Sequence, residues 1–191
     1  QRSFVLYDKA VFLHRPSFEE LPTIAAAWEK VLAVTPHHFR QQTLEQIKSD
    51  PASYLLSIDG ELDGKKVVLE DGSEVPKLPM ITRYLWTDGQ PAGSISFRWQ
   101  EGTVDLPPHV LGHIGYETFP WHQRKGYATE ALAEILDFPR RKNFPYVELT
   151  TNLDNIPSQK VILNNGGLLV EEFEKPPSSG GGRGLRYRIN L

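Results

Sequence analysis

Residues 112–129 read Gly-His-Ile-Gly-Tyr-Glu-Thr-Phe-Pro-Trp-His-Gln-Arg-Lys-Gly-Tyr-Ala-Thr, and this stretch decides the fold. The run from Val110 to Phe119 is rich in β-branched and aromatic residues, which predicts a strand. Pro120 prevents further strand pairing because it has no N–H to donate. From Tyr127 to Phe138 the apolar residues recur at helical spacing, which predicts a helix. The stretch therefore predicts a strand, a tight turn and a helix in succession.

The turn between this strand and this helix has the features of an anion site. The first N–H groups of a helix have no acceptor within the helix, and the helix dipole places about half a positive charge there. Gly126 lets the backbone approach a bulky ligand closely, and Arg124 and Lys125 add positive charge. A phosphate or diphosphate would fit this place, although a strand–glycine–helix junction alone is more often a plain connection.

The residues of the turn also fit a known spacing. Gln123-Arg124-Lys125-Gly126-Tyr127-Ala128 matches Gln/Arg-x-x-Gly-x-Gly/Ala. After a strand that ends at a proline step, this pattern resembles the acetyl-CoA pyrophosphate loop of the GNAT superfamily of N-acetyltransferases. The other phosphate-loop patterns, Gly-x-x-x-x-Gly-Lys-Ser/Thr and Gly-x-Gly-x-x-Gly, are absent.

A second segment downstream carries the other half of the resemblance. It contains a strand (146–151), Asn155-Ile156-Pro157-Ser158, a short helix that ends at Gly166-Gly167, and a strand (168–173). The two halves together resemble the superfamily from about Leu111 to Phe173. The residues of these two segments are most similar to those of the superfamily's bacterial-type predicted acetyltransferases, whose acceptors are mostly unassigned.

The rest of the chain is read from periodicity, caps and turns. The expected elements are a first strand (1–14), a helix from the Ser17–Glu20 capping box to Val34, a second helix (36–50), a strand (54–58), a hairpin (59–75), two paired strands (80–86 and 93–99), a loop (176–184) and a final strand (185–191). Pro139 should stop or kink the helix that begins at Tyr127.

The resemblance implies the fold and its boundaries. We expect an α/β (α+β) fold in a single domain over residues 1–191, with a mixed, mostly antiparallel sheet flanked by helices. The sheet should open in a V between its fourth and fifth strands. A parallel-sheet nucleotide-binding domain is disfavoured, because the strands before Leu111 come as hairpins rather than alternating with helices.

The resemblance also implies an acetyl-CoA site, residue by residue. The backbone at the end of the splayed strand should pair with the pantetheine arm, through Tyr116, Glu117 and Thr118. Backbone N–H groups of the turn should wrap the pyrophosphate, and its residues are Gln123, Arg124, Lys125, Gly126, Tyr127, Ala128 and Thr129. The second segment should meet the pantetheine, its phosphate or the nucleotide, through Asn155, Ser158 and Lys160.

Acetyl transfer to an amine needs a base, because a free alkyl amine has a pKa of about 10 and attacks only when neutral. The catalytic candidates are His113 and Glu117, with Glu148 on the next strand. An ordinary histidine titrates near neutrality, but a structural histidine tied to a neighbour is the commoner alternative for His113. On a regular strand His113 and Glu117 share one face.

The leaving thiolate also needs an acid that can protonate it. Many members of the superfamily place a tyrosine seven residues after the position of Asn155, where this chain has Ile162. Tyr116, Tyr127 or water would then have to replace it. Four aromatic residues are candidates for an acceptor pocket, with core packing as the commoner alternative: Tyr84, Trp86, Trp99 and Trp121.

Composition narrows the class of protein. The 191 residues carry a net charge of −3 and no cysteine, so we expect no nucleic-acid partner, no disulfide and no thiolate chemistry. No apolar run approaches the ~20 residues that cross a bilayer. We expect a cytoplasmic protein without a metal. A homodimer is one open option for its assembly. The removal of a segment before Gln1 is also left open.

The leading hypothesis is an N-acetyltransferase that moves an acetyl group from acetyl-CoA to a primary amine in a ternary complex. The alternative is a catalytically silent acyl-CoA-binding or sensor module. The acceptor stays open between protein N-termini, lysines, polyamines, amino sugars and amino acids. The hairpin (59–75) and the loop (176–184) are expected to shape its pocket.

Overall fold

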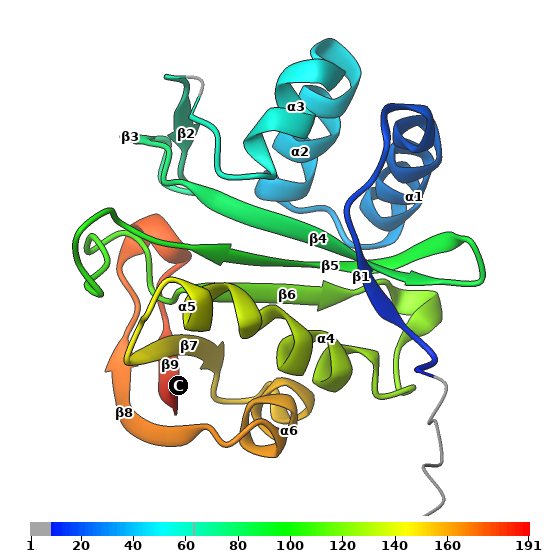
Figure 1. Ribbon diagram of the computed structural model, residues 1–191. Helices are drawn as coiled ribbons and strands as arrows, with labels where there is room; N and C mark the ends of the chain where they lie inside the picture. The colour runs from blue at the N-terminus through cyan, green and yellow to red at the C-terminus, as the bar shows by residue number, and fades with distance from the viewer. Residues whose placement is uncertain (1–8, 63) are drawn as a thin grey trace, which may run out of the picture.

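The strand before Pro120 forms the edge of a four-stranded sheet in the computed structural model, which describes residues 9–62 and 64–191 (Figure 1). All strand pairs among the described residues are antiparallel, which removes the parallel-sheet alternative. The first sheet has the order β1 (Phe12–His14), β4 (Met80–Thr87), β5 (Gln90–Arg98) and β6 (Ile114–Thr118). The second sheet has the order β7 (Tyr146–Asn152), β9 (Arg183–Asn190) and β8 (Leu168–Glu174).

Helices cover both faces of the first sheet (Figure 1). One face carries α1 (Leu21–Val34), α2 (His38–Ser49) and α3 (Pro51–Ser57). The other carries α4 (Tyr127–Ile135), α5 (Asp137–Arg141) and α6 (Ile156–Asn164). A separate hairpin pairs β2 (Lys66–Val68) with β3 (Glu74–Pro76). This layering confirms the expected mostly antiparallel arrangement flanked by helices, but the described strands form two main sheets without the parallel pair that a mixed sheet would have.

The two sheets part between β6 and β7. At the closed end, the backbone N–H of His113 donates to the carbonyl oxygen of Glu148 at 2.8 Å. Beyond this bond β6 pairs with β5 alone. With the hairpin β2–β3 set aside, β6 is the fourth strand and β7 the fifth, so the opening lies where it was predicted.

Two apolar cores hold the layers together. One lies between the first sheet and α1–α3 and includes Ile24, Trp28 and Tyr84. The other joins both sheets to α4 and includes Phe97 and Leu132. Helices α1 and α4 are amphipathic, so each buries one face in its core. Burial of apolar area on both sides fixes the sheet that carries the opening.

Local signals predicted most elements correctly. The Ser17–Glu20 box opens the first helical segment, where Glu20 Oε2 accepts from the Ser17 N–H at 2.8 Å. The second helix, both hairpins and the strands at β7 and β8 lie where they were expected. Asn155 caps α6, and that helix ends before Gly166.

The strand predicted at residues 54–58 is wrong, because these residues belong to α3 and its end. The Asp50 side chain accepts from the Ser53 N–H at 3.1 Å and caps this helix, and Pro51 occupies its first turn. Tyr54 then buries its ring in the core beneath α1–α3. A short apolar run without a clear period does not distinguish a strand from a helix.

Several predicted bounds also need correction. The first strand covers Phe12–His14, and residues 1–8 lie outside the described part of the chain. β6 begins at Ile114 rather than Val110. The helix at Tyr127 ends at Ile135, and α5 continues from Asp137 with Pro139 in its first turn. Pro139 has no N–H for the Ile135 carbonyl, so the break between the two helices is the interruption that was expected near this proline. The final strand begins at Arg183, inside the expected loop.

Candidate active site

The free edge of β6 lines one side of the opening. Phe119 donates its N–H to the Ala92 carbonyl of β5 at 2.8 Å. In an antiparallel pair, alternate residues turn both backbone groups to the same neighbour. The backbone of Glu117 therefore faces β5, whereas Tyr116 and Thr118 present their N–H and C=O groups to the gap. An extended chain in the gap could pair with these two residues as an extra strand does.

The N-terminus of α4 lies beyond the end of β6. Gly126 is the N-cap at φ +76°, with no side chain capping the helix, and Arg124 is left-handed at φ +63°. Among the described residues, no acceptor is recorded for the N–H groups of residues 124–129. Successive amides in such a turn form a concave anion site, and the helix dipole adds to it. Arg124, Lys125 and Gly126 are exposed, so this predicted site is open to a ligand.

Hydrogen bonds connect α6 and the residue after it to β6 and α4, which border the opening. Asn155 Oδ1 accepts from the Ser158 N–H at 3.2 Å, so this amide oxygen is used as a cap. The Ser158 hydroxyl lies 2.8 Å from the Tyr116 hydroxyl, which connects α6 to β6. Asn165 donates to the Thr129 carbonyl at 3.2 Å and ties α6 to α4. Lys160 is exposed and lies within α6.

The side chain of Glu117 lies on the face of the first sheet that α1–α3 cover, and it points toward α2. Its carboxylate accepts from Arg40 Nε at 3.0 Å, and the two side chains are 28% and 24% exposed. Burial raises the pKa of Glu117 above its usual value, and Arg40 opposes this rise. A carboxylate with a raised pKa near the opening has the properties of a general base.

His113 occupies the closed end of the opening, just before β6. Its Nδ1 accepts from the Glu148 N–H at 2.9 Å, and its Nε2 lies 2.7 Å from the Val104 carbonyl oxygen. Both bonds can form only on the neutral ring with its proton on Nε2. Burial lowers the pKa of His113 below its ordinary value, and the residue is 2% exposed. These contacts assign His113 a structural place, and its catalytic role stays a prediction that they do not favour.

The third catalytic candidate, the carboxylate of Glu148, lies near two arginines. Glu148 lies 3.9 Å from Arg186 Nε and 3.7 Å from Arg188 Nη2, and its side chain is 18% exposed. A cavity of about 290 Å³ between the segment at 105–111 and β9 is lined by Glu148 and Arg186. This cavity lies beside the closed end of the opening, so it is not the place where the free edge of β6 is exposed.

The two segments expected to shape the acceptor pocket meet in the structure. His37 Nε2, at the start of α2, lies 3.4 Å from Glu70 Oε1 in the hairpin turn. A side chain at Gly180 would come within 2.5 Å of Glu70 Oε2, so the segment before β9 lies directly against this carboxylate. The hairpin therefore bridges from α2 to the loop before β9, on the face of the sheet that carries Glu117.

The aromatic residues proposed for a pocket are mostly core residues. Tyr84, Trp86 and Trp99 are at most 7% exposed and belong to the two cores. Trp121 is half-buried, and the ammonium of Lys30 lies 3.9 Å from its ring centroid. Core packing, the alternative interpretation, accounts for the first three.

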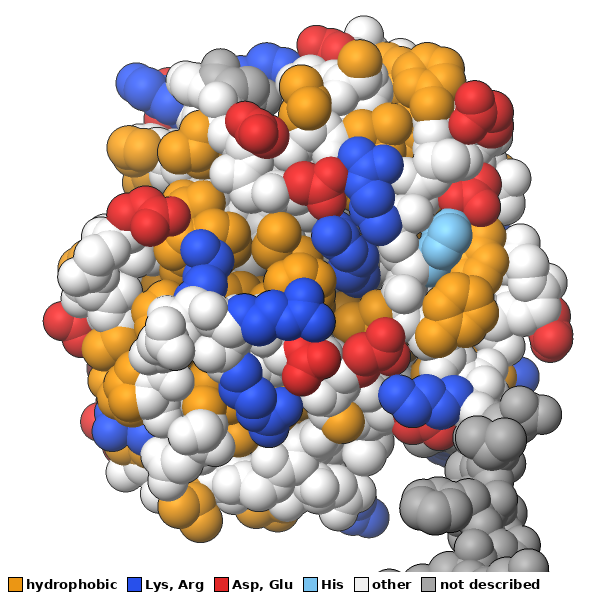
Figure 2. Space-filling model, in the orientation of Figure 1, with side chains coloured by type: hydrophobic (Ala, Val, Ile, Leu, Met, Phe, Trp, Pro, Cys, Tyr) orange, Lys and Arg blue, Asp and Glu red, His pale blue; other side chains and the backbone are white. Residues whose placement is uncertain are grey.

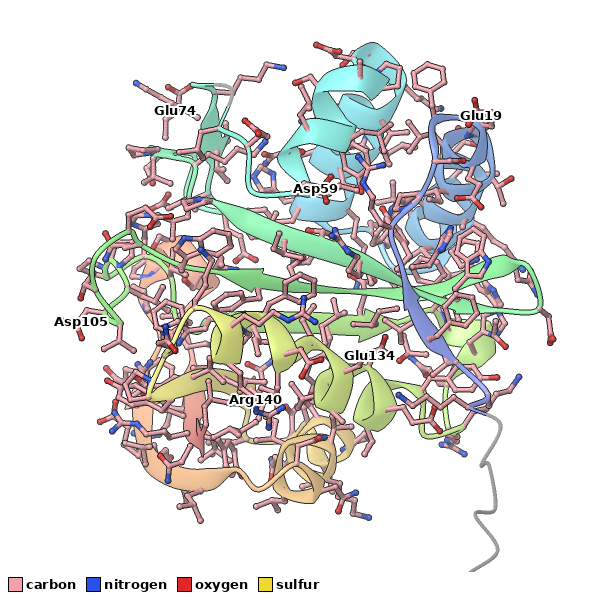
Figure 3. The ribbon with its side chains drawn as sticks, in the orientation of Figure 1. Glu19, Asp59, Glu74, Asp105, Glu134 and Arg140 are labelled. Atoms are coloured by element: carbon pink, nitrogen blue, oxygen red, sulfur yellow. The ribbon has the colours of Figure 1, made fainter. Side chains whose placement is uncertain are left out.

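Lys and Arg side chains gather in the middle of the face shown in Figure 2, but acids accompany them. Asp59, labelled in Figure 3, lies 2.8 Å from Arg15 Nε and 2.9 Å from Arg83 Nη1. Glu134 on the same face lies 3.9 Å from Lys9. Paired charges of this kind leave no strong single-sign field over this surface.

Two features that the described residues lack bear on other classes of site. No group of three His, Asp or Glu side chains within residues 9–62 and 64–191 could hold a metal ion. Among the helices of that part of the chain, none is long and apolar enough to span a bilayer. The expectations about metals and localisation stay predictions.

An antiparallel sheet that splays beside a helix N-terminus without a side-chain cap is the arrangement expected of the acyltransferase class that the sequence resembles. The family described as acetyltransferase (GNAT) domain matches residues 11–167. The chain therefore belongs to the GNAT acetyltransferase family. The assignment of residues 1–191 to one domain stays a prediction.

Solved structures of this family have the same fold. RimJ of Mycobacterium smegmatis, in complex with a CoA disulfide, is 19% identical over 95% of this chain and 82% of its own, with a TM-score of 0.64. A putative ribosomal-protein-serine acetyltransferase of Vibrio cholerae is 15% identical over 97% of both chains, with a TM-score of 0.63. The microcin C7 self-immunity acetyltransferase MccE, with acetyl-CoA and AMP, is 12% identical over 96% and 94%, with a TM-score of 0.58. No curated protein matches the sequence.

Sequence reasoning missed two residues of this region. Arg40 lies 77 positions from Glu117, so no local pattern could join them. Arg98 lies on the same face of the sheet as Glu117. Polar residues occupy alternate positions of β5 at Ser94, Ser96 and Arg98, and this pattern in the sequence could have placed Arg98 on that face.

Proposed function

We propose that this chain is an N-acetyltransferase that transfers the acetyl group of acetyl-CoA directly to a primary amine in a ternary complex. The observation that carries the proposal is the run of amides at residues 124–129 without acceptors, set at the end of a strand with a free edge. Family membership gives the reaction class, and the neighbours crystallised with CoA or acetyl-CoA support the co-substrate.

The residues present fit coenzyme A. The amides from Arg124 to Thr129, aided by the charges of Arg124 and Lys125, would hold the diphosphate. The gap-facing backbone groups of Tyr116 and Thr118 would pair with the amides of the pantetheine arm. Gln123, Tyr127, Ala128, Asn155, Ser158 and Lys160 complete the proposed cofactor-binding set. The bound thioester supplies the activated acetyl group.

Glu117 is the proposed base. It would take the proton of the acceptor ammonium, directly or through water, so that the neutral amine can attack the thioester carbon. Its raised pKa brings its affinity for a proton closer to that of the amine. Arg40 holds the carboxylate in place at 3.0 Å. Holding both substrates on one surface supplies further acceleration through orientation.

The proposed acid is the hydroxyl pair of Tyr116 and Ser158. Ile162 replaces the tyrosine that many family members have, and it is buried in the core. Burial raises the pKa of Tyr116, so its phenol stays protonated at neutral pH. When the C–S bond breaks, this phenol would give its proton to the thiolate, and Ser158 at 2.8 Å would stabilise the phenolate.

Thiol release from acetyl-CoA, measured over a panel of primary amines, tests the function. The proposal predicts amine-dependent release that falls about 100-fold or more in Glu117→Gln and less steeply in Tyr116→Phe. Glu45→Gln, which neutralises an exposed carboxylate of α2 outside the proposed site, is the matched control and should change the rate little. Coenzyme A binding without amine-dependent release from any amine would instead identify a silent acyl-CoA-binding module.

A further inference from the structure

The half-buried guanidinium of Arg98 makes no hydrogen bond or ion pair with the described residues. Arg98 ends β5, and its Nε is buried without an acceptor among the described residues. The structure gives its guanidinium no ion pair within that part of the chain. Burial lowers the pKa of Arg98, and no neighbouring carboxylate raises it. The group still carries its charge at neutral pH, because an ordinary arginine titrates above about 12.

Other half-buried arginines of the chain differ from Arg98. Arg83, with 15% of its side chain exposed, lies 2.9 Å from Asp59 and donates to two backbone carbonyls. Arg40 pairs with Glu117 and also donates to the Thr35 carbonyl. Buried charges are normally paired because an unpaired one is costly. The unpaired guanidinium of Arg98 is therefore available to a partner from outside the chain.

The guanidinium lies on the face of the proposed acceptor site. A side chain at Gly115 would come within 2.9 Å of Arg98 Nη2, so the guanidinium covers this glycine of β6. Gly115 and Glu117 are two residues apart on one strand and thus share a face, at a separation of about 6–7 Å. A small molecule on this face could contact the carboxylate of Glu117, the proposed base, with one end and the guanidinium of Arg98 with the other.

The surroundings favour a small acceptor. The turn of the β2–β3 hairpin lies against Gly180, as described above. Figure 1 shows the hairpin, the segment before β9 and the C-terminal end of β5 at the same end of the sheet. These segments lie beside the end of β5 that carries Arg98, so we expect them to limit the size of the acceptor.

We propose that Arg98 is the anion subsite of the acceptor, and that the acceptor is a small amine that also carries an oxyanion, a carboxylate or a phosphate. The planar fork of a guanidinium suits either group. The acceptor's amine would face Glu117 and its oxyanion would face Arg98. This inference rests on the proposed function, which it deepens by naming the substrate class.

The test compares matched amines in the thiol-release assay. The pairs are L-amino acids against their amides, and O-phosphoethanolamine against ethanolamine. The ratio of kcat/KM within each pair is compared between the wild type and Arg98→Gln, which cancels the different intrinsic reactivities of the amines. We expect Arg98→Gln to lower the anionic-to-neutral ratio about 10- to 100-fold. Carboxylates and phosphates are separate arms, and the arm that shows the loss identifies the anion.

Two further variants separate charge, geometry and folding. Arg98→Lys keeps the charge without the fork and should lose part of the ratio. Arg83→Gln removes a half-buried arginine that is already paired and should leave the ratio unchanged. Thermal unfolding midpoints of all three establish that each is folded. An unchanged ratio in both Arg98 variants overturns the proposal.

A binding experiment keeps this inference separate from the proposed reaction. The complex with coenzyme A is titrated calorimetrically with N-acetyl-L-amino acids, with their amides and with N-acetyl-O-phosphoethanolamine. Binding of an anionic member that Arg98→Gln abolishes supports the subsite even if no amine is acetylated. Acetylation of neutral amines alone, with no Arg98-dependent binding of any anion, overturns the subsite and leaves the acetyltransferase function standing.

Discussion

His113 gives the sharpest contrast between a structural and a catalytic role. Replacing it with alanine removes the acceptor of the Glu148 N–H and the donor to the Val104 carbonyl. A buried polar group left without a partner costs about 1–3 kcal/mol. Because Val104 lies in a half-buried segment that water can reach, we expect a total loss of about 2–4 kcal/mol. This is a large part of a typical stability of about 5–15 kcal/mol.

The assay measures two quantities on the same samples. Urea denaturation gives the free energy of unfolding, and the rate per folded molecule is measured at low temperature. A structural His113 predicts the stability loss with activity within a few-fold of the wild type. A catalytic base predicts the reverse, a rate lower by about 100- to 10,000-fold in a protein of unchanged stability. That second result would refute the reasoning.

A neighbouring histidine provides the control. His109 lies in the same segment and makes no hydrogen bond with the described residues. We expect His109→Ala to change the stability by less than about 0.5 kcal/mol. If it costs as much as His113→Ala, the loss reflects a fragile segment rather than the two bonds of His113.

The same residue predicts a dependence on pH. The folded-state pKa of His113 lies below its unfolded value of about 6.5, so the unfolded chain binds more protons than the folded one in the window below 6.5. Stability from this residue is present above that value and is lost as the pH falls toward the folded pKa. The stability difference between wild type and His113→Gln should shrink on acidification through this window. A constant difference would contradict the neutral, buried ring.

Two other substitutions test neighbouring parts of the account. Arg40→Gln removes the cation that lowers the pKa of Glu117, so the acidic limb of the kcat/KM profile should move to higher pH; an unmoved limb means that another group titrates. Tyr84→Phe removes the hydroxyl shared by Trp28 Nε1 at 2.9 Å and Tyr54 at 2.6 Å. This buried loss should lower the free energy of unfolding by about 1–3 kcal/mol in urea, and an unchanged midpoint contradicts it.

The sequence predicted the parts of this protein that depend on neighbours along the chain. The caps at Glu20 and Asn155 and the turn at Gly126 each involve residues within four positions of one another. Their geometry follows from local hydrogen bonding, which a sequence displays directly. The resemblance over residues 111–173 then placed these elements in one fold, including the opening beside β6.

The parts that the sequence did not predict depend on distant contacts. Only the folded chain brings the Glu148 N–H, 35 positions away, to the ring of His113. The run at Tyr54 has too few residues to show a period, so its helix depends on the Asp50 cap and on core contacts that the sequence does not display. Arg98 could be recognised as unpaired only once every neighbour on the sheet was known.

In the proposed complex, the amides at the start of α4 bind the diphosphate of coenzyme A. This contact can be measured by calorimetric titration of the intact protein with coenzyme A and with pantetheine, which has no diphosphate. We expect coenzyme A to bind far more tightly than pantetheine, and the double variant Arg124→Glu/Lys125→Glu to lose most of this difference. Equal binding of coenzyme A by wild type and double variant, or no binding by the wild type, would contradict it.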